Sequence, residues 1–259
     1  MTCGRLRTSS PRIASLVVTR RGNAFGKLSE ILPGSTKLKN MTKQKILFLV
    51  IFTVVSLVAF QVTVSKIVGS GQSFTLFELI APIGGMFLGS VLGGLSALFV
   101  RLINVVLFKQ SLDFLTVIRF FPAVLAAAYF GLKTKKTAII FPICIALFLL
   151  NPIGRQAWLY PMIWLIPFGV TFFKKRLILN SLGATFTAHA VGSTIFLYAF
   201  GLTPQIWLAL IPVVFIERGV FTVGIWLSFM AFNTVLDKLS QLSFARPLKQ
   251  FVKQEYVIA

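Results

Sequence analysis

Residues 46–64 read ILFLVIFTVVSLVAFQVTV, a run of nineteen residues without a charged side chain. A helix needs roughly 20 apolar residues to cross a bilayer, within a range of about 17–25. Six further apolar runs follow along the chain: Phe74–Phe108, Phe114–Leu132, Thr137–Ile153, Ala157–Phe173, Leu177–Gly201 and Gln205–Leu236. This pattern predicts an all-α fold, a polytopic helical bundle embedded in a membrane.

The composition excludes a water-soluble domain. Hydrophobic residues make up 56% of the 259 residues and charged residues 12%, and the mean hydropathy is +0.87. Soluble proteins carry about 25% charged residues. Because so few charges cannot cover a water-facing surface of this size, we expect an integral membrane protein.

The chain is strongly basic, with 26 Lys and Arg against 6 Asp and Glu and a net charge of +20. In membrane proteins such an excess collects in cytoplasmic loops and tails. The basic residues are scattered between apolar runs instead of forming one patch, so nucleic acid is not an expected partner. Cys3 and Cys144 give no basis for a disulfide or a metal site.

The composition divides the chain into three parts. Residues 1–44 are basic and contain no apolar stretch long enough for a secretory signal, and we expect them to form a disordered cytoplasmic tail. Met41 is an alternative start of the protein. The transmembrane domain is expected over residues 45–237, followed by a basic cytoplasmic tail over residues 238–259.

Two runs are too long for one perpendicular helix. The 35 residues of Phe74–Phe108 reach about 53 Å at 1.5 Å per residue, against a bilayer core of about 30 Å. A break is expected at Pro82 and the Gly84-Gly85 pair. Gln205–Leu236 is expected to be one strongly tilted helix, or a short element ending near Pro212 and then a longer helix.

The basic clusters predict the topology. They occur in the tail through Lys45, at Lys133–Lys136, at Lys174–Arg176 and after Lys238. All of them fall on one side of the membrane if Phe74–Phe108 crosses twice and every other run crosses once. This solution gives about eight helices, in a range of about six to eight, with both termini cytoplasmic. The expected location is the cell membrane, of the bacterial inner-membrane type.

A repeat of small residues competes with that solution. Gly85, Gly89, Gly93 and Ala97 recur every four residues up to Arg101, which would draw a ridge along one continuous helix. Phe74–Pro82 would then be a short or re-entrant piece. The ridge has two interpretations, ordinary close helix packing or a docking face for a partner.

Residues for catalysis are scarce. His189 is the single histidine, and the acids Glu78, Asp113 and Glu217 lack close metal-ligand spacing. A Gly-x-Ser-Gly helix start is missing, and so is a Gly-x-x-x-x-Gly-Lys-Ser/Thr loop for nucleotide phosphates. The sequence therefore predicts no enzyme, no cofactor and no metal, and any active transport would need an ion gradient or a separate motor.

Polar residues inside the apolar runs are candidates for a binding site, because charges at membrane depth are costly. Neighbours on a helix point about 100° apart, so Glu217 and Arg218 are expected to have separate partners: an arginine for Glu217, and Glu78 or a ligand anion for Arg218. A purely structural ion-pair network is the alternative. We expect a cavity, lined by residues of three runs: Arg119, His189, Ser193, Glu217 and Arg218.

Two further patterns leave alternatives open. Thr185, His189 and Ser193 form one polar stripe on a helix, which faces either a cavity or neighbouring helices. Trp158, Tyr160 and Trp164 gather around Pro161 and suggest an interfacial aromatic belt, or else a lid over the substrate.

The passage FTLFELIAPIGGMFLGSVLGGL, residues 74–95, resembles the second-to-third helix region of substrate-binding S components of energy-coupling-factor transporters. The likeness covers Ile46–Phe108. The Ala123-x-x-x-Ala127 pair is similar to small-residue pairs by which such proteins dock their membrane-coupling subunit. The family's usual fold has fewer helices, and its docking pair lies on the first helix, whereas here the pair falls on the fourth.

The resemblance implies a membrane-embedded subunit that binds a small vitamin-like nutrient and works with separate ATPase and coupling subunits. Arginines outnumber acids inside the runs, which favours an anionic ligand. The expected partners are this ligand, membrane lipid and those subunits. Docking would use the small-residue faces Gly85, Gly89, Gly93, Ala123 and Ala127. The alternative is a non-transporting scaffold or assembly factor that packs partner helices through its Gly-rich face.

Overall fold

The computed structural model describes residues 34–66, 73–132, 134–173 and 175–258. The chain divides into two units, Met1–Ile46 and Leu47–Ala259. It is about 82% helical, and its described residues contain one two-stranded hairpin. The all-α prediction is therefore confirmed. Residues 1–33 of the predicted tail lie outside the described residues, whereas residues 34–44, also assigned to that tail, are helical.

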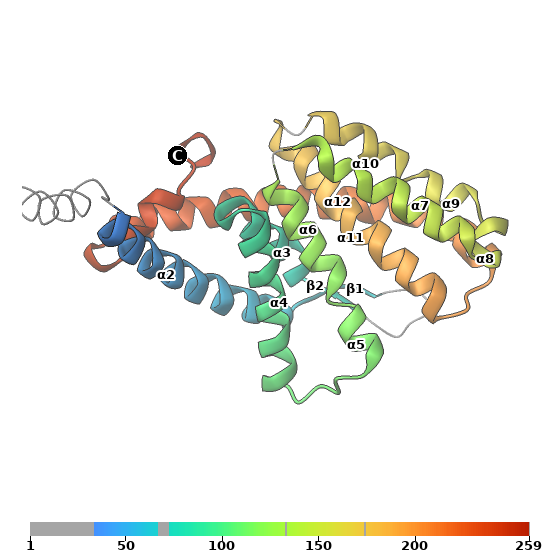
Figure 1. Cartoon of the computed structure of the whole chain (residues 1–259), viewed down its shortest axis with the longest axis horizontal. Coiled ribbons are helices and arrows are strands. Elements are labelled where there is room, and N and C mark those ends of the chain that lie inside the picture. Colours follow the sequence, from blue (N-terminus) through green and yellow to red (C-terminus); the bar gives the residue numbers. More distant parts are fainter. Residues whose placement is uncertain (1–33, 67–72, 133, 174, 259) are drawn as a thin grey trace, which may run out of the picture. The chain divides into compact units, whose positions relative to one another are not determined.

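Helices of very unequal length follow one another along the chain (Figure 1). The described elements are α2 (Gly34–Phe60), β1 (Thr63–Lys66), β2 (Ser73–Thr75), α3 (Phe77–Leu88), α4 (Ser90–Leu107), α5 (Phe114–Ile118), α6 (Phe121–Gly131), η1 (Lys135–Ile139), α7 (Ile140–Leu150), α8 (Pro152–Gln156), α9 (Leu159–Met162), α10 (Leu165–Val170), η2 (Thr171–Phe173), α11 (Leu177–Ala199), α12 (Pro204–Ser240), η3 (Ser243–Phe251) and η4 (Gln254–Tyr256).

Three helical segments of the described chain are long and apolar enough to cross a membrane: Lys43–Phe60, Ser90–Leu107 and Pro204–Ser240. With 23 residues, α11 reaches about 35 Å, but its middle is rich in polar side chains. Other apolar helices are shorter, such as α3 with 12 residues. The chain is thus a helical membrane protein, and the count of about eight crossings stays a prediction.

The outside of the protein is apolar and part of its inside is polar. Val91 and Ile216 are each 72% exposed, while Thr187 and Thr194 are buried. The two threonine hydroxyls donate hydrogen bonds to carbonyl oxygens of their own helix, at 2.8 Å each. Lipid cannot replace such hydrogen bonds, so this distribution fits a chain surrounded by hydrocarbon.

The long run Phe74–Phe108 breaks at Gly89, between α3 and α4. Gly89 has a φ of 84°, a left-handed conformation that glycine adopts without the steric cost of a Cβ. The predicted break at Pro82 and Gly84-Gly85 is wrong, because all three lie inside α3. The ridge on a single continuous helix is wrong for the same reason, since the chain changes direction at Gly89.

Small residues let α3, α4 and α6 pack closely. A Cβ added at Gly85 would overlap the carbonyl oxygen of Ala127, and one added at Gly93 would overlap Gly85 itself. Ala123 and Ala127 are buried as well. These contacts lie within the chain, so four residues of the predicted docking face are occupied by their own neighbours. Gly89 is the fifth, and its role is the turn.

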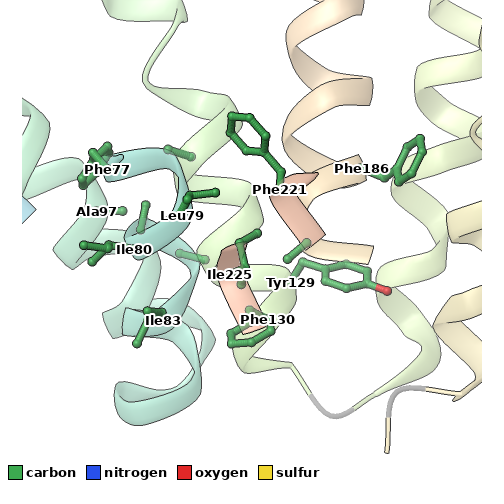
Figure 2. Packing of buried hydrophobic residues seen from close by; sticks show 14 of the residues in the cluster. Phe77, Leu79, Ile80, Ile83, Ala97, Tyr129, Phe130, Phe186, Phe221 and Ile225 are labelled. Atoms are coloured by element: carbon green, nitrogen blue, oxygen red, sulfur yellow. The ribbon is translucent and has the colours of Figure 1, made fainter. Parts of the chain in front are cut away.

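An apolar core surrounds this crossing. Figure 2 shows Ile80 and Ile83 of α3 near Phe130 of α6 and Ile225 of α12. The ring of Phe130 lies 6.2 Å from that of Phe229 on α12. Aromatic and branched side chains thus fill the space around the glycines and fix the positions of these helices.

The run Gln205–Leu236 belongs to one helix, α12, which has 37 residues and includes Pro212. The one-helix alternative is therefore the correct one. Within the predicted C-terminal tail, residues 238–240 complete α12, and the following residues pack back onto the chain: Leu248 is fully buried. Asn233 of α12 exchanges two hydrogen bonds of 2.8 Å with the backbone of Lys253.

Candidate functional site

A cavity of about 530 Å³ lies among α3, α4, α6, α9, α11 and α12. Small-molecule sites usually measure about 300–1,000 Å³, so this cavity has the size of such a site. Every residue of the predicted binding site lines it: Arg119, His189, Ser193, Glu217 and Arg218. The structure thus brings these five side chains together, and that a ligand binds there stays a prediction.

Arg218 is almost completely buried and contacts several protein groups. Its Nη2 lies 2.7 Å from Glu217 Oε2, and its Nη1 donates a hydrogen bond to Thr185 Oγ1 at 3.1 Å. The guanidinium also lies over the rings of Phe74 and Phe221, at 5.1 and 4.5 Å. The expectation that Glu217 and Arg218 have separate partners is wrong, because both side chains are long enough to bridge the angle between them.

A second ion pair joins α3 and α4. Arg101 Nη2 lies 2.5 Å from Glu78 Oε1, and the guanidinium stands 5.2 Å from the centre of the Phe77 ring. Sequence reasoning placed Arg101 at the end of a ridge and offered Glu78 to Arg218, so it missed this pair. The sequence did carry a signal for this pair: Glu78 and Arg101 lie in the same apolar run, one on each side of its break.

Arg119 differs from the other two arginines. It lies in the turn between α5 and α6 and is half-buried. Within the described part of the chain it forms no ion pair and no hydrogen bond; its charge interacts with Glu78, Arg101 and Asp113 at longer range. Because Glu78 is already bound to Arg101, it cannot fully neutralise Arg119.

Asp113 does not supply the missing partner. Its side chain is exposed and does not line the cavity. Its Oδ1 accepts a hydrogen bond from the backbone N–H of Thr116 at 2.6 Å. Hydrogen bonds from the Thr116 side chain and backbone hold the pKa of Asp113 below its usual value. Water screens an exposed carboxylate, so Asp113 caps α5 and leaves the charge of the cavity almost unchanged.

His189 is the centre of a neutral hydrogen-bond network. The indole N–H of Trp164 donates to His189 Nδ1 at 3.1 Å. Since Nδ1 accepts, the ring is uncharged and carries its proton on Nε2. That nitrogen faces the Tyr160 hydroxyl at 3.1 Å and the Ser193 hydroxyl at 3.3 Å. The polar stripe therefore presents hydroxyl groups to the cavity, with the histidine orienting them.

The aromatic-belt interpretation is wrong for two of its three residues. Tyr160 and Trp164 are buried, and the exposed residue of the three is Trp158. Tyr160 lies 4.9 Å, between ring centres, from Trp207 of α12. Trp207 also lines the cavity and was not foreseen, because a single tryptophan at the start of an apolar run carries no pattern of its own.

The charged side chains of the cavity wall do not balance one another. In the described ranges, no three His, Cys, Asp or Glu side chains gather where they could hold a metal ion. The described cavity wall carries three arginines and two glutamates, with no lysine or aspartate. With His189 neutral, one positive charge is left without a matching negative charge, and that charge belongs to Arg119.

The chain is similar to an uncharacterized protein of Methanocaldococcus jannaschii. The two are 25% identical over 237 residues, which cover 83% of this chain and 79% of that protein. No family model matches the chain, and no solved structure matches it.

Proposed function

We propose that the protein is a membrane-embedded substrate-binding subunit for the uptake of a small anionic or vitamin-like nutrient. The observation that carries this proposal is Arg119, an arginine on the wall of a cavity among apolar helices that has no ion-pair partner among the described residues. An unpaired arginine at membrane depth costs at least about 2.5–3.5 kcal/mol. A ligand anion would offset that cost through charge-assisted hydrogen bonds.

Energy for uptake would come from a separate complex. The sequence has no loop for nucleotide phosphates, and its resemblance to energy-coupling-factor S components supports ATPase and coupling subunits as partners. Docking through Gly85, Gly93, Ala123 and Ala127 is not retained in this proposal, because these residues are covered by their own chain. The scaffold alternative relied on the same face and loses its support in the same way.

In this proposal the chain crosses the cell membrane about eight times with both termini in the cytoplasm. The four basic clusters support this topology, because it would place all of them on the cytoplasmic side. Reporter fusions after Lys136, Arg176 and Ala259 should all give a cytoplasmic signal. A periplasmic signal from any of the three would overturn the helix count.

The decisive experiment is identification of the molecule that the protein carries. The protein would be purified in mild detergent, denatured, and the released metabolites analysed by mass spectrometry. A small anion recovered from wild-type protein and depleted in Arg119→Gln supports the proposal. Recovery of envelope-assembly proteins with no metabolite, together with absence of uptake in cells, would support the scaffold function instead.

A further inference from the structure

We infer that the cavity binds an organic monocarboxylate with a flat apolar body, and that Arg119 binds its carboxylate. This inference rests on the proposed function and narrows its substrate class. It assigns different roles to three arginines that the sequence treats alike: Arg101 and Arg218 hold the cavity together, and Arg119 recognises the ligand.

The charge of the cavity selects a single negative charge. Arg101 pairs with Glu78 and Arg218 pairs with Glu217, so the described wall keeps the one positive charge of Arg119. Uncompensated charge in a low-dielectric interior is unfavourable whichever its sign. A monoanion brings the total to zero, whereas a phosphate monoester, with about −1.5 to −2 at pH 7, would leave the cavity negative.

Arg119 also has the geometry for a carboxylate. Its guanidinium is a planar set of donors that matches two carboxylate oxygens, and no hydrogen bond within the described chain uses those donors. Arg218, by contrast, is 2% exposed and bound to Glu217 and Thr185. The charge of Arg218 is already matched by that of Glu217, so no ligand anion is needed to neutralise it.

Further polar atoms on the wall favour a ligand rich in acceptors. Four buried donors have no hydrogen-bond partner among the described residues: Trp207 Nε1, Arg101 Nε, and Nε and Nη2 of Arg218. Asn104 Oδ1 is a buried acceptor in the same condition. All four side chains line the cavity. Because donors predominate, oxygen-rich groups suit this wall better than amines do.

The rest of the wall would hold an apolar, flat body. One face of α12 lines the cavity from Trp207 to Phe221, a length of about 21 Å at 1.5 Å per residue. Aromatic rings from other elements join it, among them Phe120 and Phe196. Rings favour stacked and edge-on contacts with other flat rings, so an aromatic body gains more here than a flexible chain does.

A set of probes with one body and different charges tests the inference. Purified protein in a non-ionic detergent at pH 7 would be titrated with indole-3-acetate, indole-3-acetamide and indoxyl phosphate, with the melting temperature as readout. Octanoate adds a carboxylate with a flexible acyl chain, of the kind a bilayer supplies. Wild type should bind indole-3-acetate most tightly, and about tenfold or more above the amide, the typical gain from a charged hydrogen bond.

Arg119→Gln should abolish the preference for the acetate over the amide while leaving the melting temperature without ligand near wild type. Arg155→Gln is the matched control, since Arg155 is exposed and does not line the cavity; it should keep the preference. Equal binding of acetate and amide, tighter binding of the phosphate, or a preserved preference in Arg119→Gln would overturn the inference.

Two other outcomes separate this inference from the proposed function. Tighter binding of octanoate than of indole-3-acetate would overturn the flat body and indicate an acyl carboxylate drawn from the bilayer. If none of the probes binds but a neutral or doubly charged metabolite copurifies with the protein, the monocarboxylate is wrong and the uptake function stands. Absence of any metabolite and of uptake would overturn both.

Discussion

The region where α3, α4 and α6 pack against one another, here called the crossing, differs from the cavity beside it in how side chains occupy the space between helices. At the crossing, glycines remove side chains so that backbones touch, and no space is left at Gly85 or Gly93. Along α11 and α12, polar and aromatic side chains instead line a cavity of about 530 Å³. Arg101 connects the two regions, since it lies on α4 and lines the cavity.

The difference shows what each kind of residue contributes in a membrane. In lipid, the hydrophobic effect contributes little to helix association. Van der Waals contacts between closely packed backbones, which small residues allow, therefore supply much of the free energy of association. Charged groups need partners, and where the protein supplies an opposite charge, as Glu217 does for Arg218, the pair is structural. Where the described residues supply no opposite charge, as for Arg119, the group is available to a ligand. Substitutions in the two regions should therefore fail in different ways.

The largest effect is expected at the crossing. Gly85→Leu would drive a side chain into the carbonyl oxygen of Ala127, and overpacking of this kind costs about 3 kcal/mol or more. We expect little folded protein, measured as the monodisperse fraction in size-exclusion chromatography. Gly219→Ala is the control, because a Cβ there meets nothing within 4 Å, and its stability should stay within about 1 kcal/mol of wild type.

Ala127→Leu separates internal packing from partner docking. Ala127 is fully buried, so the larger side chain should lower the melting temperature and the yield of folded protein. A docking residue would behave differently: the variant would fold and bind ligand normally but fail to copurify a partner. That result would show that the α6 face is available to other proteins.

Arg218→Gln should come next in size. The change removes the ion pair with Glu217 and the hydrogen bond to Thr185, and breaking a buried pair costs about 3 kcal/mol. Thermal unfolding in detergent measures the loss. The double variant with Glu217→Gln should recover part of it, since both charges are then gone. An unchanged melting temperature together with lost ligand binding would instead make Arg218 the ligand arginine.

Much of this architecture follows from sequence by simple rules. Apolar runs of sufficient length predict helices, and polar residues inside them predict a cavity. By this rule five residues could be grouped from the sequence, and all five line one cavity: Arg119, His189, Ser193, Glu217 and Arg218. Partners could not be predicted in the same way. The rule that buried charges are paired is satisfied whether Arg218 binds Glu78 or Glu217. Which of the two it binds depends on the lengths of the side chains and on how the helices are placed relative to one another.

The break at Gly89 shows a second limit. Pro82 and the Gly84-Gly85 pair carry the usual signals of a helix end, yet they lie inside α3. The position of the turn was decided by tertiary packing, because Gly85 must stay helical to contact Ala127. Tyr160 and Trp164 were misplaced for a similar reason: a short aromatic cluster has the same composition at an interface and in a core.

The smallest effect separates a cavity hydroxyl from a surface hydroxyl. Tyr160→Phe keeps the ring against Trp207 but removes the hydroxyl that lies 3.1 Å from both His189 Nε2 and Ser193 Oγ. Ser193 can still accept a hydrogen bond from the histidine, so the loss of stability should be about 1 kcal/mol, measured by thermal unfolding.

Tyr198→Phe is the matched control: its hydroxyl donates a hydrogen bond to the carbonyl oxygen of Leu147 at 2.8 Å, but Tyr198 is 57% exposed. That change should stay within about 0.5 kcal/mol. Equal losses of stability in the two variants would mean that the His189 network stabilises the protein no more than an isolated surface hydrogen bond does. The cavity wall would then not be ordered by its hydrogen bonds, and the proposed contrast with the closely packed crossing would be wrong.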